Sequence, residues 1–315
     1  MDREYIRKLL VDTPLYELLA MADKVRRENV GDEVHIRALL EFSNYCDRNC
    51  SYCGLSIENT SLDRYILDYD DIYTTAKKAK EIGYKTIVLQ SGESRRIDTE
   101  KLAKVVNRIS NLDMVVTLSI GELSYSEYKQ LYDSGAKRFL LKHECASHEL
   151  YAKLHEGYNL NDRINCAKII KGIGYEYGGG FLVGLPFEDI DLLIDNLLLL
   201  KELECDMVGI GTFLPHNMTR LKDMPHGDYE LTLRCVAITR LLLPKANIPV
   251  TTSLSFLGDN KLVYNGGANV VMVKITPQNV RELYEIYPNK RKSSGMLEDR
   301  ENICRLIESL GRLPI

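Results

Sequence analysis

Three cysteines lie close together in the stretch Cys46-Asp-Arg-Asn-Cys50-Ser-Tyr-Cys53, with the spacing C-x3-C-x2-C. Thiolates at such spacing bind zinc or iron. Zinc sites usually use four protein ligands, often as two separated pairs, and no second pair follows here. Three thiolates suit a 4Fe–4S cluster that keeps its fourth iron open for another ligand. The sequence therefore predicts that Cys46, Cys50 and Cys53 hold such a cluster; the alternative is three buried cysteines that happen to be close.

The elements that must position these cysteines alternate between short apolar runs and amphipathic stretches. Apolar residues at three- and four-residue spacing indicate helices between the runs. Strands separated by helices indicate parallel βαβ units, and eight such units close into a barrel. The expected strands are Val34–Ser43, Thr86–Ser91, Met114–Ile120, Arg138–His143, Glu176–Val183, Met207–Phe213, Pro249–Ser253 and Asn269–Ile275. We therefore expect an α/β fold, a (β/α)8 TIM-type barrel with N- and C-terminal helical additions. The lead-in covers residues 1–33, and the barrel with its C-terminal helix covers residues 34–315.

Polar residues follow several of the expected strands directly. The three cysteines follow the first strand, Gln90-Ser-Gly-Glu93 ends the second, and Lys142 and Glu144 end the fourth. Active sites of such barrels lie at the carboxyl ends of the strands. These residues are therefore expected to meet at one mouth.

Composition limits the class of protein. The 315 residues carry 41 basic and 45 acidic side chains, a net charge of 41 − 45 = −4, and 45% of them are hydrophobic. This balance is that of a globular domain and gives no general attraction to nucleic acid. No apolar run is long enough to cross a membrane, and the charged N-terminus does not resemble a signal peptide. We expect a cytoplasmic protein with no nucleic-acid or membrane partner.

The cysteine motif, with Tyr52 before its last cysteine and placed after the first strand of a barrel, resembles that of the radical S-adenosylmethionine (SAM) enzymes. The resemblance implies two cofactors, a 4Fe–4S cluster and SAM, and a one-electron reductant such as ferredoxin or flavodoxin. In this family, reduction cleaves SAM to methionine and a 5′-deoxyadenosyl radical. The Gln90–Glu93 stretch looks like the family's Gly-Gly-Glu element, which binds the methionine amino group, with Ser91 replacing the first glycine.

The resemblance also implies the remaining cofactor contacts. Glu144 would accept from the ribose hydroxyls, Lys142 would serve an anionic group, and Arg163 would pair with the methionine carboxylate. The complete expected set of SAM contacts is Tyr52, Gln90, Gly92, Glu93, Ser119, Lys142, Glu144, Arg163 and Met207.

Five segments resemble the HydE group, the radical SAM maturases of FeFe-hydrogenase, which are related to biotin synthase and methylornithine synthase. They are Gly31–Arg37, Thr86–Glu93, Val116–Glu122, Asp206–His216 and Leu241–Thr252. The resemblance implies that the substrate is an iron–CO–cyanide–cysteine precursor and that the partner maturases are HydG and HydF. The substrate contacts it implies are Thr117, Arg138, Thr251, Thr252, Met272 and Tyr284. Hydroxyls and one arginine inside a barrel suit a small polar anion, although threonines there can also satisfy strand-end backbone groups.

Departures from the HydE pattern leave the substrate open. Some members carry a second cysteine cluster near the C-terminus, whereas Lys290–Leu306 contains only Cys304, so we expect no auxiliary cluster. The stretches that follow the seventh and eighth expected strands also differ from that pattern. The alternatives are a HydE-like enzyme with a small organic substrate, of methylornithine synthase or biotin synthase type, and a scaffold that carries iron species without turnover.

Overall fold

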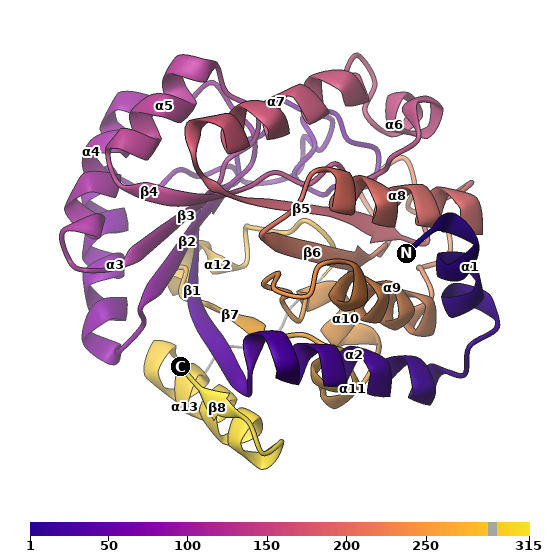
Figure 1. Ribbon diagram of the computed structural model, residues 1–315. Coiled ribbons are helices and arrows are strands. Elements are labelled where there is room, and N and C mark those ends of the chain that lie inside the picture. Colours follow the sequence, from indigo (N-terminus) through magenta and orange to yellow (C-terminus); the bar gives the residue numbers. More distant parts are fainter. Residues whose placement is uncertain (289–294) are drawn as a thin grey trace.

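A curved parallel sheet forms the centre of the protein in the computed structural model, which describes residues 1–288 and 295–315 (Figure 1). Within these residues the strand order is β6-β5-β4-β3-β2-β1-β7, and a short strand β8 pairs with the beginning of β1. The strands are β1 (Glu33–Ser43), β2 (Thr86–Ser91), β3 (Val115–Ser119), β4 (Ala136–Leu140), β5 (Glu176–Val183), β6 (Met207–Thr212), β7 (Val270–Lys274) and β8 (Leu313–Pro314). All neighbouring pairs are parallel, so the carboxyl ends of β1 to β7 share one edge.

Helices surround this sheet. They are α1 (Arg3–Val11), α2 (Leu15–Val30), α3 (Tyr69–Ile82), α4 (Thr99–Ser110), α5 (Tyr125–Asp133), α6 (His148–Leu154), α7 (Leu160–Ile173), α8 (Ile190–Glu202), α9 (Tyr229–Leu242), α10 (Thr252–Leu257), α11 (Asn260–Asn265), α12 (Gln278–Arg281) and α13 (Met296–Ser309). The N-terminal helix α2 packs on α9, outside the ring of helices that follow the strands. Among the described residues, none of these helices has the length and apolarity to span a bilayer.

The predicted βα alternation is confirmed, except in one strand. Residues 249–253 form no strand: segment 247–249 makes only isolated bridges to β6 and β7, and α10 begins at Thr252. Side chains there replace strand hydrogen bonds, because the Thr251 hydroxyl donates to the Ile210 carbonyl and the Thr212 N–H donates to the Ser253 hydroxyl. The expected strand Asn269–Ile275 is therefore β7, and β4 begins two residues earlier than expected, at Ala136.

Strand β1 shows how the sheet creates both a core and a site. Its even-numbered residues, such as Val34, Ile36 and Leu40, are 0–3% exposed and face the helices. Its odd-numbered residues Arg37 and Glu41 line a cavity on the concave face, because successive strand side chains point to opposite faces. The inner face of the barrel therefore carries charged groups where such barrels are usually filled by Val, Ile and Leu.

Candidate active site

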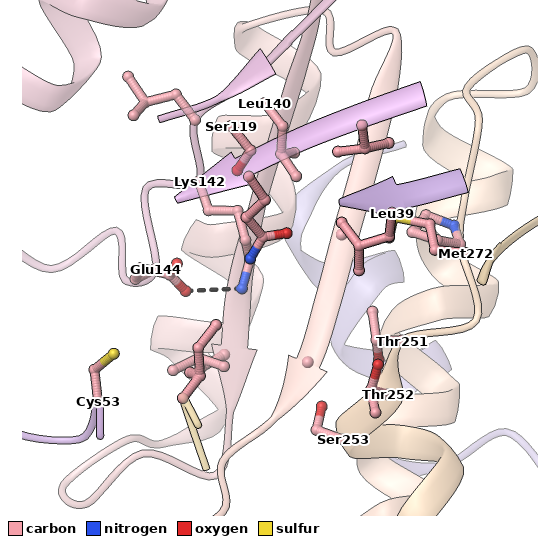
Figure 2. A pocket seen from close by; sticks show the side chains of 18 of the residues that line it. Leu39, Cys53, Ser119, Leu140, Lys142, Glu144, Thr251, Thr252, Ser253 and Met272 are labelled. Carbon is pink, nitrogen blue, oxygen red and sulfur yellow. Dashed lines mark hydrogen bonds and ion pairs between the residues drawn. The ribbon is translucent and has the colours of Figure 1, made fainter. Parts of the chain in front are cut away.

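One cavity of about 360 Å³ opens at the carboxyl ends of the strands. Every predicted site residue except Arg138 lines it: Cys46, Cys50, Tyr52, Cys53, Gln90, Gly92, Glu93, Thr117, Ser119, Lys142, Glu144, Arg163, Met207, Thr251, Thr252, Met272 and Tyr284. Figure 2 shows Lys142 and Glu144 between Cys53 on one side and Thr251, Thr252 and Met272 on the other. The cavity therefore joins the predicted cofactor residues to the predicted substrate residues.

The three cysteines lie on a loop that is fixed from several sides. The Asp47 N–H donates to the Glu93 carbonyl, and the Gly54 N–H donates to the Ile286 carbonyl, both at 2.7 Å. A side chain at Gly92 would collide with the Tyr45 carbonyl and with Cys46, so only glycine allows the second strand's loop to lie this close. The cysteine loop and the Gly92-Glu93 turn are thus one packed unit.

The three thiols are the donor set that the sequence predicts for a cluster, and all of them line the cavity. All three are free, and burial raises the pKa of each, that of Cys50 to about 12, so a bound metal must displace protons. In the part of the chain that the structure describes, no three His, Cys, Asp or Glu side chains converge on one metal-ion position. Ligands that bind different irons of one cluster need no such convergence, so three free thiols at one cavity wall are a chemically suitable donor set for a 4Fe–4S cluster.

Four charged side chains, Arg48, Glu93, Glu122 and Arg163, form a closed network beside the cysteines, here called the charge quartet. Arg48 donates to Glu93 and, at 2.6 Å, to Glu122 Oε2, while Arg163 lies 3.1 Å from Glu122 Oε1 and 3.5 Å from Glu93 Oε2. Their side chains are only 9–17% exposed. Each charge is therefore compensated by neighbours on two sides.

Glu122 and Arg48 were not predicted from the sequence as site residues. Arg163 was predicted to pair with a ligand carboxylate, and in the structure it pairs with two protein carboxylates while still lining the cavity. Glu122 follows Gly121 at the end of the third strand, just as Glu93 follows Gly92 at the end of the second. That repeated Gly-Glu pair was a usable signal. Arg48, inside the cysteine loop, had no comparable signal.

Lys142 and Glu144 form an ion pair across the cavity wall, with 2.9 Å between Nζ and Oε2 (Figure 2). A side chain at Gly180 would press against Lys142 Cε and the Gly209 carbonyl, so glycines on β5 and β6 make room for the lysine. Glu144 has a φ of 61°, a left-handed conformation that is uncommon outside glycine. The turn after β4 thereby aims both charged side chains at the cavity.

The inner end of the cavity, lined by Arg37, Thr117 and Met207, has fewer paired polar groups. Arg37 is 5% exposed, and its Nη1 donates only to Met207 Sδ at 3.3 Å; across residues 1–288 and 295–315 it has no salt bridge. Burial, with the nearby Arg138 guanidinium, lowers the pKa of Arg37 to about 9. The Thr117 hydroxyl is also buried without a partner, whereas the Thr251 hydroxyl is satisfied by Ile210.

Arg138 is the one predicted substrate contact that the structure does not place at the cavity wall. Its Nε lies 2.5 Å from Glu176 Oε2, and in register it faces Glu176, the first residue of β5. Arg138 is thus paired with the first residue of β5 and does not line the cavity, whereas Arg37 does. Arg37 was not predicted as a site residue because the strand pattern does not show which side chains reach the cavity. Its charge within an otherwise apolar strand was the available signal.

A further pair on β1 and β7 was also missed. Lys274 Nζ lies 2.7 Å from Glu41 Oε2, and the Thr276 hydroxyl donates to the same carboxylate. Burial raises the pKa of Glu41. Next to it, the Gln90 amide donates to the Tyr284 hydroxyl at 3.1 Å, so this wall of the cavity is polar but internally paired.

Comparison with known proteins agrees with this geometry. The Radical SAM superfamily model matches residues 40–200. The chain is 44% identical over 304 residues to the [FeFe] hydrogenase maturase subunit HydE of Thermotoga maritima, covering 94% of this chain and 86% of that protein. The chain is a radical SAM enzyme of the HydE family. The family implies a 4Fe–4S cluster and SAM, for which the cysteine loop provides a fitting donor set.

More distant relatives share the same scaffold. The 3-methylornithine synthase of Methanosarcina acetivorans is 28% identical, over 99% of this chain and 89% of its own. The crystal structure of methylornithine synthase (PylB) superposes with a TM-score of 0.84 and 25% identity, covering all of this chain and 94% of that one. The HydE family therefore shares its barrel with enzymes named for small organic products.

Proposed function

We propose that Cys46, Cys50 and Cys53 hold a 4Fe–4S cluster and that SAM binds in the adjoining part of the cavity. When bound and reduced by one electron, this cofactor pair supplies a 5′-deoxyadenosyl radical. The observation that carries the proposal is the single cavity that joins the three thiols to the polar inner end. The protein's own task is to bind, orient and exclude water.

The charge quartet is suited to the methionine part of SAM. That group carries both an ammonium and a carboxylate, and Glu93 and Arg163 present both signs at the cavity surface. Arg48 and Glu122 keep the two functional charges oriented from behind. We assign the remaining SAM contacts to Tyr52, Gln90, Gly92, Ser119, Lys142, Glu144 and Met207, which line the same cavity.

We assign the substrate to the inner end, and propose the iron–CO–cyanide–cysteine precursor of the H-cluster of FeFe-hydrogenase. Among the described residues, a buried cation without a salt bridge and a buried hydroxyl without a hydrogen-bond partner favour an anion, because such groups are costly until a ligand satisfies them. Arg37 takes the place expected of Arg138. The other proposed contacts are Thr117, Thr251, Thr252, Met272 and Tyr284, all at the cavity wall.

The partners follow from the same family. We propose that the enzyme works with the maturases HydG and HydF and receives its electron from a ferredoxin or flavodoxin. We place it in the cytoplasm, since all eight cysteines are free and reduced thiols are typical of that compartment.

The proposal is tested by two assays on the anaerobically reconstituted protein. Reduction with dithionite in the presence of SAM should release 5′-deoxyadenosine. With purified HydG and HydF, the protein should be required to activate apo-hydrogenase. Full activation of the hydrogenase without this chain would reject the maturase assignment, even if SAM is cleaved.

A second candidate is a radical SAM enzyme that acts on a small organic substrate. The near-complete overlap with methylornithine synthase in sequence and in structure favours it as the alternative. The higher identity to HydE, 44% against 28%, ranks it second. Detection of 3-methylornithine in reactions supplied with common amino acids would reverse that order.

A further inference from the structure

Behind the cysteine loop, a chain of aromatic side chains connects Tyr52 to the charge quartet. The Tyr52 hydroxyl lies 2.9 Å from His155 Nε2, and His155 stacks on Tyr151 with 4.1 Å between ring centroids. The Tyr151 hydroxyl then accepts from Arg163 Nε at 3.3 Å. His155 and Tyr151 are 2% and 1% exposed, so the chain is shielded from solvent.

The hydrogen bonds determine which nitrogen of His155 carries the proton. Nδ1 lies 2.9 Å from the Tyr151 carbonyl oxygen, which can only accept. Nδ1 must therefore donate, and burial, which lowers the pKa of His155 to about 3, keeps the ring neutral. Nε2 is then a lone-pair acceptor, and the Tyr52 hydroxyl donates to it.

The same helix also holds the cysteine loop by its backbone. His155 is the C-cap of α6, and the residue before it, Leu154, accepts from the Ser51 N–H at 2.9 Å. The Tyr52 ring packs against a small apolar cluster that includes Leu150, Leu154 and Phe213. The orientation of the ring is thus set by packing on one side and by one hydrogen bond at its hydroxyl.

We propose that His155 is a positioning residue of the cofactor site. Its Nε2 holds the Tyr52 ring beside Cys53, and through Tyr151 the same helix supports Arg163, so two walls of the SAM site are set as one unit. This inference rests on the proposed SAM site and assigns a role to a histidine that does not itself line the cavity.

Two substitutions at His155 separate this role from simple packing. His155→Gln places an amide oxygen near the position of Nε2 and keeps an acceptor for Tyr52, but loses the Nδ1 donor. His155→Asn keeps a donor near Nδ1 and loses the acceptor. Both remove the stacked ring equally. Tyr52→Phe deletes the same hydrogen bond from the other side and leaves the packing intact.

The experiment measures SAM affinity rather than turnover. Each reconstituted variant is first assayed for iron content and thermal unfolding, and SAM is then titrated against the EPR signal of the reduced cluster. Tyr52→Phe and His155→Asn should raise the Kd of SAM about 3- to 10-fold, the range of one buried hydrogen bond, and should change the EPR signal of the SAM-bound state. His155→Gln should stay within about twofold of the wild type.

The outcomes are distinguishable from failure of the proposed function. If the wild-type protein loads iron but its EPR signal does not respond to SAM, the proposed SAM site itself is rejected. If the wild type responds but Tyr52→Phe binds SAM equally well, or if the Gln and Asn variants are indistinguishable, His155 has only a packing role. If the His155 variants do not load iron, Tyr52→Phe alone decides.

Discussion

The buried arginines at the two ends of the cavity differ in their partners. At the cysteine end, Arg163 sits between two carboxylates, and the whole quartet is internally compensated. At the inner end, Arg37 is equally buried, yet among the described residues its guanidinium forms no salt bridge and donates one hydrogen bond, to a methionine sulfur. The charge quartet is paired without a ligand, whereas among the described residues Arg37 has no salt bridge and the Thr117 hydroxyl has no hydrogen-bond partner.

This difference indicates how each end meets its ligand. Each charge of a compensated network is held in place by its neighbours, which suits the proposed role of the quartet in holding SAM in a fixed orientation. An uncompensated buried cation lowers the stability of the free protein and favours an anion that replaces its lost hydration. The contrast predicts that similar substitutions at the two ends will have effects of opposite sign.

The largest effect is expected at the cysteine loop. Cys46→Ala should abolish cluster binding and 5′-deoxyadenosine production, because two thiolates do not hold the cluster that three are proposed to bind. Iron and sulfide analysis with the SAM cleavage assay checks this. Cys304→Ala, at a cysteine on α13 outside the cavity, is the matched control and should retain both. Retained 5′-deoxyadenosine production in Cys46→Ala would contradict the cluster assignment.

Arg163→Met should be the next most damaging change. It leaves Glu93 and Glu122 buried with Arg48 as their remaining partner from the quartet, and such an uncompensated charge costs about 3–5 kcal/mol. Urea unfolding of the unloaded protein measures the loss of free energy of unfolding. The SAM-dependent EPR change should weaken in parallel. An unchanged unfolding free energy would show that the quartet does not contribute to stability.

Arg37→Met makes the same chemical change at the inner end and should act in the opposite direction. Removing a buried cation that has no salt bridge should raise the free energy of unfolding by about 1–3 kcal/mol. The same variant should lose the ability to support hydrogenase activation, since the anionic substrate loses its cation. Destabilisation by Arg37→Met would indicate that Met207 and the surrounding wall already compensate the charge, and the contrast between the ends would fail.

The location of the site was predictable from the sequence, whereas the pairing of its charged side chains was not. Residues at the carboxyl ends of parallel strands converge, so Cys53, Glu93 and Glu144 could be placed together from the strand pattern alone. Which side chains reach the cavity depends on the register of the strands, and the pairing of Arg138 with Glu176 at the start of β5 was not visible in the strand pattern. The partners of Arg163 lie on three different segments, and no local pattern specifies such contacts.

The one incorrect strand has a similar cause. Residues 249–253 have the composition of a strand, but the Thr251 and Ser253 side chains form the hydrogen bonds that a strand would make through its backbone. Local side-chain bonds of this kind compete with sheet formation. Apolar periodicity does not show such bonds, so it predicted eight barrel strands, whereas among the described residues β6 and β7 are linked only through the isolated bridges of segment 247–249.

The smallest effect on the free energy of unfolding is expected at a single hydroxyl of the inner end, that of Thr117. Thr117→Val is nearly isosteric and removes a buried hydroxyl that has no partner, so the free energy of unfolding should rise slightly, by up to about 1 kcal/mol. Thr232→Val is the matched control, because that buried hydroxyl donates to the Asp228 carbonyl and accepts from Thr212; its loss should destabilise by about 1–3 kcal/mol. Hydrogenase activation should need several-fold more substrate with Thr117→Val, since a ligand hydrogen bond is lost. If both variants destabilise equally, Thr117 is already satisfied in the free protein, and its hydroxyl is as well paired as the charge quartet.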